Sequence, residues 1–229
     1  MDIEKLVKKR HSVRDYLDKE IEEEKVLELQ KEIDKINKEN NLNIQLILND
    51  SKTFDKFILS YGKLNANNYL AMIGKNSKDL DEKIGYYGEA LVLKAQSLGL
   101  NTCFVSGTFN KKNVSAKINK DEKLLCVIAI GYGKTNGNIR KSKTFDEVSI
   151  SKDVPSWYKK GIEYALLAPT AINEQKFTFE LIDDNTVLAT SLNGIGNTKL
   201  DLGIVKYNFE LGAGKDNFKW KWLTIISQV

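Results

Sequence analysis

Apolar side chains recur every three or four residues in several stretches of the chain, a spacing that places them on one face of a helix. In the stretch from about Glu22 to Asn40 they alternate with charged residues. In the stretch from Asp79 to Leu98 they form a longer stripe that Gly99 ends. This spacing predicts helices over residues 2–10, 22–40, 79–98, 156–167 and about 200–211.

Shorter apolar runs between these stretches are typical of strands. The run from Leu124 to Gly131 is almost wholly apolar, as expected of a buried central strand. Residues 111–117 predict a helical turn, and residues 52–68 fit no single period. We expect strands at 43–48, 69–73, 102–105, 124–131, 177–182 and 186–190, with a last strand region around 220–226. Helices and strands in this order indicate a mixed α/β or α+β protein.

A polar arm over residues 135–152 divides the pattern. On either side of it, the long helices match at five positions, which suggests two related halves, about 1–148 and 149–229. The alternative is that two amphipathic helices share a period by chance. The matched residues are Leu80, Asp81, Ile84, Tyr87 and Leu91 in the first helix, and Leu200, Asp201, Ile204, Tyr207 and Leu211 in the second.

Composition narrows the class of protein. The 229 residues are 41% hydrophobic, enough for a substantial core, and the net charge of +4 is too small to indicate a nucleic-acid coat. Cys103 and Cys126 lie in apolar runs, and only one histidine is available to join them, so we expect no metal site. No apolar stretch has the length of a membrane helix or the form of a signal region. We therefore expect a cytoplasmic protein that binds neither membrane nor nucleic acid.

The segment Arg10-His11-Ser12-Val13-Arg14 follows the first predicted helix and has no helical period. Cationic side chains and a hydroxyl at alternate positions can point to one side, and guanidinium groups suit a phosphate dianion. The alternative is a solvated helix end whose cations complement the helix dipole. His11, the sole histidine, has no paired carboxylate or nucleophile nearby in sequence, so we interpret it as lining a cofactor or ending the helix.

A second polar segment, Ala168 to Gln175, follows a later helix that Pro169 ends. Asn173 and Gln175 offer amide groups that can pair with a ring edge of alternating acceptors and donors. A capped turn between a helix and a strand is the alternative. Taken together, the two segments look like opposite ends of a site for one anionic, heteroaromatic cofactor.

Four stretches of the chain resemble the FMN-dependent nitroreductase family. Two are the segments just described, as far as the Lys176-Phe177 that follows the second. A third runs from Gly88 to Phe109 and is similar to the central helix and following loop of that family. The fourth runs from Ala129 to Val148. The resemblance implies an α+β nitroreductase-like fold over 1–229 as a single domain, with a central mixed or antiparallel sheet flanked by helices.

By this resemblance, the first segment and the lysines of the arm would surround the FMN phosphate and ribityl chain, and Arg14 would lie near the pyrimidine edge of the ring. The second segment would pack beside the ring, and the backbone near Ser106 would approach the flavin N5 atom. The implied cofactor-binding residues are Arg10, His11, Ser12, Arg14, Val105, Ser106, Gly107, Lys141, Lys143, Pro169, Thr170, Ala171, Asn173 and Gln175.

The chain departs from the family pattern in two respects. Lys176 stands where the family usually has proline, and the turn with Asn173 comes in the second half of the chain instead of the first third. A fused duplication would explain the second departure. Ordinary members are homodimers with flavin at the subunit interface, so one chain with two related halves would form a pseudo-dimer with one composite FMN site.

The function implied is hydride transfer from NADH or NADPH through FMN to a small-molecule electron acceptor, such as a nitroaromatic or a quinone. The flavin carries the redox chemistry, so no catalytic acid, base or nucleophile is expected from the protein. The chain would be a monomer or a homodimer. Two alternatives stay open at this point: a flavin-binding protein for storage or sensing, and a small basic nucleic-acid-binding protein.

Overall fold

The computed structural model describes residues 2–54 and 64–221, and its larger sheet has four antiparallel strands. Their order is β1 (Gln45–Ile47), β2 (Asn68–Lys75), β4 (Glu122–Gly131) and β3 (Asn101–Val105). The two central strands, β2 and β4, pair from Asn68 opposite Ile130 to Lys75 opposite Glu122, with a bulge after Met72. Their nearly unbroken apolar sequence matches burial of both faces.

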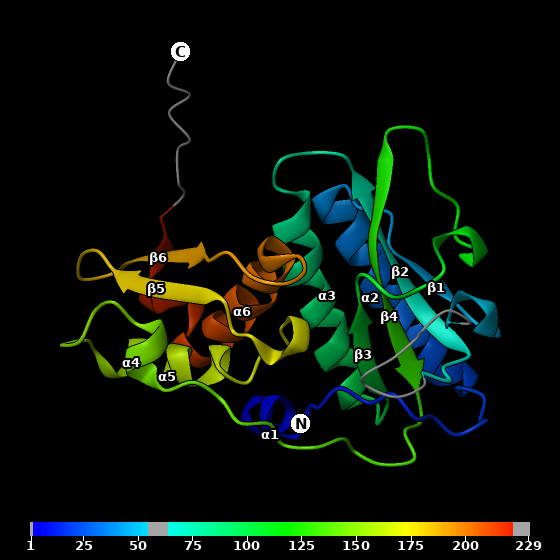
Figure 1. Cartoon of the computed structure of the whole chain (residues 1–229), viewed down its shortest axis with the longest axis horizontal. Helices are drawn as coiled ribbons and strands as arrows, with labels where there is room; N and C mark the ends of the chain where they lie inside the picture. Colours follow the sequence, from blue (N-terminus) through cyan, green and yellow to red (C-terminus); the bar gives the residue numbers. More distant parts are fainter. Residues whose placement is uncertain (1, 55–63, 222–229) are drawn as a thin grey trace.

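Two long helices cover one face of this sheet, α2 (Glu23–Asn40) and α3 (Leu80–Ser97) (Figure 1). Ile33 and Ile36 of α2 and Ile84 and Leu91 of α3 join Met72 in one buried cluster. The opposite face is covered by the N-terminal segment after α1 (Ile3–Lys9) and by loops. Two short 3-10 helices, Ser51–Phe54 and Lys111–Asn113, lie on this side.

A second, smaller sheet holds β5 (Phe177–Leu181), β6 (Thr186–Ser191) and β7 (Lys219–Trp220). β5 and β6 are antiparallel, whereas β6 and β7 are parallel. The helices around this sheet are α4 (Phe145–Val148), α5 (Ser156–Ala165) and α6 (Thr198–Ala213), and a 3-10 helix at Lys215–Asn217 precedes β7. Aromatic rings fill the space between α6 and this sheet, with Phe209 stacked on Phe179.

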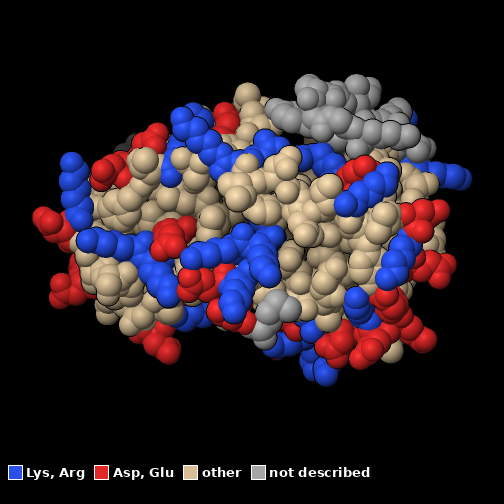
Figure 2. All heavy atoms as spheres, turned by 90° about the horizontal axis from the view of Figure 1, so that it is seen from below, with Lys and Arg blue, Asp and Glu red and all other residues tan. Residues whose placement is uncertain are grey.

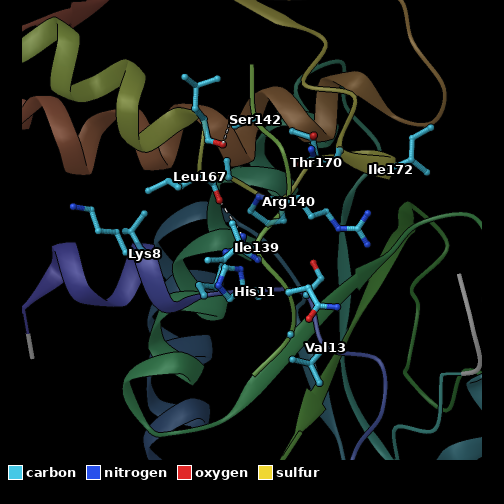
Figure 3. A pocket seen from close by; sticks show the side chains of 18 of the residues that line it. Lys8, His11, Val13, Ile139, Arg140, Ser142, Leu167, Thr170 and Ile172 are labelled. Carbon is cyan, nitrogen blue, oxygen red and sulfur yellow. Dashed lines mark hydrogen bonds between the residues drawn. The ribbon is translucent and has the colours of Figure 1, made fainter. Parts of the chain in front are cut away.

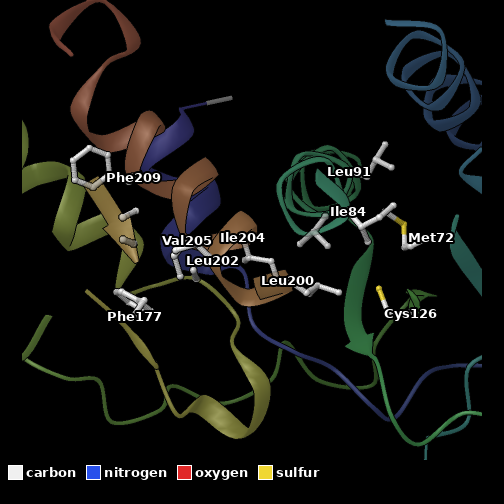
Figure 4. Close-up of a cluster of buried hydrophobic side chains, with 14 of the residues drawn as sticks. Met72, Ile84, Leu91, Cys126, Phe177, Leu200, Leu202, Ile204, Val205 and Phe209 are labelled. Atoms are coloured by element: carbon white, nitrogen blue, oxygen red, sulfur yellow. The ribbon is translucent and has the colours of Figure 1, made fainter. Parts of the chain in front are cut away.

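The two parts of the molecule meet where α3 packs against α6 (Figures 1 and 4). The contact is unusually close because each helix supplies a glycine. A Cβ atom on Gly85 would lie 1.9 Å from the carbonyl oxygen of Leu200, and one on Gly203 would lie 1.9 Å from the carbonyl oxygen of Glu82. No side chain larger than hydrogen fits at either point.

These two contacts are reciprocal. They relate residue 85 to 203 and residue 82 to 200, an offset of 118 residues, whereas the apolar matches seen in the sequence differ by 120. A reciprocal contact is what a two-fold axis between the helices produces. The relation between the two parts of the chain stays a prediction, since the two registers differ by two residues.

The predicted elements agree with the structure in kind and order. The fold is α+β, as expected, although its strands are divided between two sheets. The helical turn expected at 111–117 is limited to Lys111–Asn113, and residues 222–226 of the last predicted strand region lie outside the described residues. Of the helices described, none has both the length and the apolar character required to span a bilayer.

Candidate functional site

The segment after α1 runs beside the larger sheet and is joined to it by isolated bridges. Ser12 forms a parallel bridge with Thr102, and the Val13 amide donates to the Thr102 carbonyl at 3.0 Å. Val13 and Tyr16 are buried in the core beneath it. This packing fixes the backbone of the segment from Arg10 to Arg14.

The second predicted segment forms a tight turn after α5. It holds a 3-10 helix at Ala171–Asn173, and three of its residues have left-handed backbone: Ile172 (φ 44°), Asn173 (φ 60°) and Gln175 (φ 50°). A β-branched residue rarely adopts this conformation, and such strain concentrates at binding sites. Asp201, in the first turn of α6, accepts a hydrogen bond from the Ala171 amide at 3.0 Å. Burial raises the pKa of Asp201 to about 6.

The polar arm joins this turn to the N-terminal segment. Asn173 Nδ2 donates to the carbonyl oxygen of Lys141, and Lys143 Nζ donates to that of Gln175. Gly137, with φ 79°, lies so close to the N-terminal segment that a Cβ atom would be 2.7 Å from the Cβ of His11. Three segments that are far apart in sequence therefore share one place in the fold.

A cavity of about 380 Å³ lies where these segments meet (Figure 3). Its volume is within the range of small-molecule sites. The N-terminal segment forms one wall, with His11 and Val13 in view, and the arm contributes Arg140 and Ile139. The end of α5 and the following turn close the other side from Leu166 to Thr170, with Ile172 and Asn173.

The charge of this cavity is one-sided. None of the described residues that line the cavity is acidic, whereas four lining residues carry positive charge: Lys8, Arg10, Arg14 and Arg140. Arg14 and Arg140 form no ion pair with any described residue, and the buried Nε atom of Arg14 has no hydrogen-bond partner there. In the view from below, Lys and Arg side chains gather near the middle of the face (Figure 2). The cavity is therefore suited to an anion.

Arg10 differs from these other cations because its side chain is buried. Its Nη2 atom donates to the Leu167 carbonyl at 3.0 Å, and its Nε atom lies 3.8 Å from Oε1 of Glu89 in α3. Burial raises the pKa of the Glu89 carboxyl to about 7, although Arg10 opposes that rise. Burial and the neighbouring Arg10 lower the pKa of His11.

The structure brings together most of the residues expected from the sequence. Those that line the cavity are Arg10, His11, Ser12, Arg14, Pro169, Thr170 and Asn173. Ala171, Lys141 and Lys143 belong to the turn and the arm without lining it. Val105 ends β3 and is followed by Ser106 and Gly107; all three lie beyond the point where Thr102 meets Ser12, and they do not line the cavity either.

Gln175 has a different position from the one expected of a ligand contact. Its side chain is 1% exposed. Its Nε2 atom donates to the Leu166 carbonyl at 2.8 Å, and its Oε1 atom accepts from the Lys143 amide at 2.7 Å. The amide therefore joins the end of α5 to the arm, and so shapes the cavity from behind.

Replacing Gln175 with alanine should lower the free energy of unfolding by about 2–4 kcal/mol, because buried donors and acceptors would lose their partners. Urea unfolding followed by tryptophan fluorescence measures this change. Asn173→Ala is the matched control, since Asn173 shares the left-handed backbone but contributes one side-chain hydrogen bond near the surface. Equal losses in the two variants would show that backbone strain, and not the buried amide, explains the effect.

Several lining residues were not among those predicted. Arg140 lies directly before Lys141, and its charge was a usable signal, but the sequence does not show which cation of the arm faces inward. Lys8, Ile139 and Ile172 also line the cavity. Glu89 contacts Arg10 without lining the cavity, and it left no such signal, because it lies on the face of α3 opposite the apolar stripe and is buried there against α6.

Comparisons with known proteins relate this fold to a protein family and to solved structures. The model of the family described as "Putative TM nitroreductase" matches residues 2–213. No curated protein matches the sequence. Among solved structures, a "putative nitroreductase" from Thermotoga maritima is 21% identical with a TM-score of 0.66, and the match covers 94% of this chain and 85% of that one.

Two shorter proteins share the fold over about two thirds of this chain. A "putative nitroreductase" from Desulfovibrio desulfuricans, solved in complex with FMN, is 17% identical with a TM-score of 0.54, covering 68% of this chain and 99% of that one. A nitroreductase family protein from Streptococcus pneumoniae is 15% identical with a TM-score of 0.53, covering 66% and 100%. Because the family model extends over nearly the whole chain, this protein belongs to the nitroreductase family.

Proposed function

We propose that the protein binds FMN in this cavity and acts as a flavin-dependent oxidoreductase. The observation that carries the proposal is the one-sided donor set, with guanidinium groups, a hydroxyl and no carboxylate among the described lining residues. FMN brings a phosphate dianion and a ring that gains negative charge when reduced, so this donor set fits it. The unpartnered Nε atom of Arg14 adds a buried donor that a ligand can satisfy.

The residues of the chain would bind and orient the cofactor. Arg10 and Ser12 would hold the phosphate and ribityl end, with Lys141 and Lys143 close by on the arm. Arg14 would stand at the pyrimidine edge, where a fixed cation favours the anionic reduced ring. Asn173 would contact the ring or the ribityl oxygens, and Pro169, Thr170 and Ala171 would pack beside it.

When bound, FMN would supply the redox chemistry, taking hydride from NADH or NADPH and passing electrons to a small acceptor such as a nitroaromatic or a quinone. The residues of the chain would restrict the access of water to the bound flavin, and they would determine how much room an acceptor has above the ring. Ile139, which is 88% exposed, and Ile172 offer apolar surface at the rim of the cavity. An acceptor with an apolar ring is the class that this rim favours.

Flavin content tests the binding. Protein purified with excess FMN and then desalted should be yellow and should release one FMN per chain on denaturation. The reciprocal contact between α3 and α6 supports a pseudo-dimer, in which the second half has no Arg-x-Ser segment of its own to complete a second site. Two FMN per chain would contradict the composite site, and colourless protein that takes up no FMN would contradict the proposal itself.

Reduction tests the activity. Anaerobic mixing of the loaded protein with NADH, and separately with NADPH, should bleach the flavin absorption, and adding a quinone should restore it. A flavin that stays oxidised with both nucleotides would instead indicate a storage or sensing role.

A further inference from the structure

Glu89 lies at the point where the two parts of the molecule meet behind the cavity. It belongs to α3 and its side chain is fully buried. Its Oε1 atom lies 3.8 Å from Arg10 Nε and accepts a hydrogen bond from Nδ2 of Asn208, in α6, at 3.2 Å. Its Oε2 atom has no hydrogen-bond partner among the described residues. A carboxyl so placed stabilises a neighbouring cation at the cost of its own desolvation.

Arg10 is held from two sides while it lines the cavity. Glu89 faces its Nε atom, and the Leu167 carbonyl at the end of α5 accepts from its Nη2 atom. Burial and these contacts restrict the guanidinium, although its Nε atom makes no hydrogen bond with a described residue and meets Glu89 only as an ion pair. An anion in the cavity that bonds to Arg10 therefore meets a cation whose position is already set, and it competes with Glu89 for the same positive charge.

We propose that Glu89 is a positioning residue of the cofactor site, which holds Arg10 at the cavity wall and takes up a proton when the FMN phosphate binds to Arg10. The inference rests on the proposed function, because it requires that the phosphate reaches Arg10. The physical reason is mutual repulsion. A phosphate and the Glu89 carboxylate on either side of one guanidinium repel each other, and protonation of the buried Glu89 removes this repulsion.

The other ionisable groups near Arg10 and Glu89 have pKa values outside the range from pH 7 to 8.5. His11, beside Arg10, has a pKa below its ordinary value of 6.5. Tyr207 of α6 has its pKa raised to about 12, mainly by burial and partly by Glu89. Burial also raises the pKa of Cys103 of β3, above its ordinary value of 9.0 and against the pull of Arg14, Arg10 and Arg140. Between pH 7 and 8.5, Glu89 is the group in this set whose protonation changes.

The direction of the pH effect follows. The free protein loses the Glu89 proton as the pH rises through about 7. The complex keeps that proton to a higher pH, so FMN affinity is greatest below pH 7 and falls as the pH rises above it. The phosphate of FMN is already largely a dianion there, because its second pKa is about 6. Its own titration therefore does not produce the fall.

The test compares the wild-type apoprotein with Glu89→Gln, which keeps the shape and is always neutral. FMN fluorescence quenching gives Kd at pH 7.0, 7.75 and 8.5, and riboflavin, which lacks the phosphate, is measured in parallel. Glu82→Gln is the control, since Glu82 is also on α3 but pairs with Lys206 of α6. We expect the wild-type Kd for FMN to rise about five- to tenfold over this range, Glu82→Gln to behave likewise, and Glu89→Gln to show no rise. Riboflavin should show none in any of the proteins.

The same FMN slope in Glu89→Gln as in wild type would overturn the inference, as would the same slope with riboflavin. Calorimetry of the wild-type protein at pH 8 in two buffers of different ionisation enthalpy gives a second measurement that needs no variant. It should show net proton uptake with FMN and none with riboflavin, and absence of uptake with FMN would also overturn the inference. Failure of the wild-type protein to bind FMN at any pH would contradict the proposed function instead.

Discussion

Replacing both Gly85 and Gly203 with alanine should lower the free energy of unfolding by about 2–6 kcal/mol or more. Each new methyl group would meet a backbone carbonyl oxygen of the facing helix at 1.9 Å, and backbone cannot rotate out of the way as a side chain can. The helices would have to separate along their whole contact, exposing apolar residues of both (Figure 4). Overpacking of this kind costs about 1–3 kcal/mol or more per site, against a total stability of about 5–15 kcal/mol.

Far-ultraviolet circular dichroism and urea unfolding measure this loss, with each single variant as an intermediate case. Gly88→Ala is the matched control on the same helix. Its methyl group would meet the ring of Phe104 at 3.0 Å, a side chain that can yield by a few tenths of an ångström. Since alanine also favours a helix by about 1 kcal/mol over glycine, the control should be nearly neutral. A double variant at Gly85 and Gly203 as stable as this control would contradict the close helix contact.

Replacing Arg14 and Arg140 together with methionine should weaken FMN binding by about a thousandfold, while each single change weakens it about 10- to 100-fold. A hydrogen bond to a charged partner contributes about 1.5–3 kcal/mol, and each tenfold change in Kd corresponds to about 1.4 kcal/mol. Both arginines line the cavity, and neither pairs with a carboxylate among the described residues. Their removal therefore leaves no buried charge without a partner, so the fold should be kept.

Fluorescence titration of the apoproteins measures these affinities, and the melting temperature without flavin confirms that the fold is intact. Lys159→Met is the control, because Lys159 is exposed on α5 and does not line the cavity. Arg10 is a poor choice for this purpose, since Arg10→Met would leave Glu89 buried beside no cation. Unchanged FMN affinity in the double variant would place the cofactor elsewhere.

Periodicity and local chemistry were enough to predict most of the helices and strands, but not α4, which lies within the polar arm and is too short to show a helical period. The stripe in α3 and the apolar sequence of β4 left little choice, because both are set by nearest neighbours in the sequence. The meeting of the segments around Ser12 and Pro169 was expected from the resemblance and from the match between their side chains and one anionic ligand. The cavity confirms that they lie together.

What the sequence did not indicate depends on tertiary packing. The amide of Gln175 looks like a ligand group, and only the fold shows that the carbonyl of Leu166 and the amide of Lys143 already occupy it. In the same way, which basic residue of the arm faces inward is set by the path between Gly137 and Asn173. The division of the strands into two sheets was also missed, because pairing partners are not encoded in the period of a single strand.

The long reach of Arg10 has a consequence for how this protein is made. Arg10 is synthesised before both of its partners, so it forms its contacts only after Glu89 and then Leu167, 157 positions later, have left the ribosome. At about 5–20 residues per second, this is a delay of many seconds. During that time the future wall of the cavity is an exposed cationic segment, and a nascent chain that ended before the turn at Ala171 would lack the opposite wall.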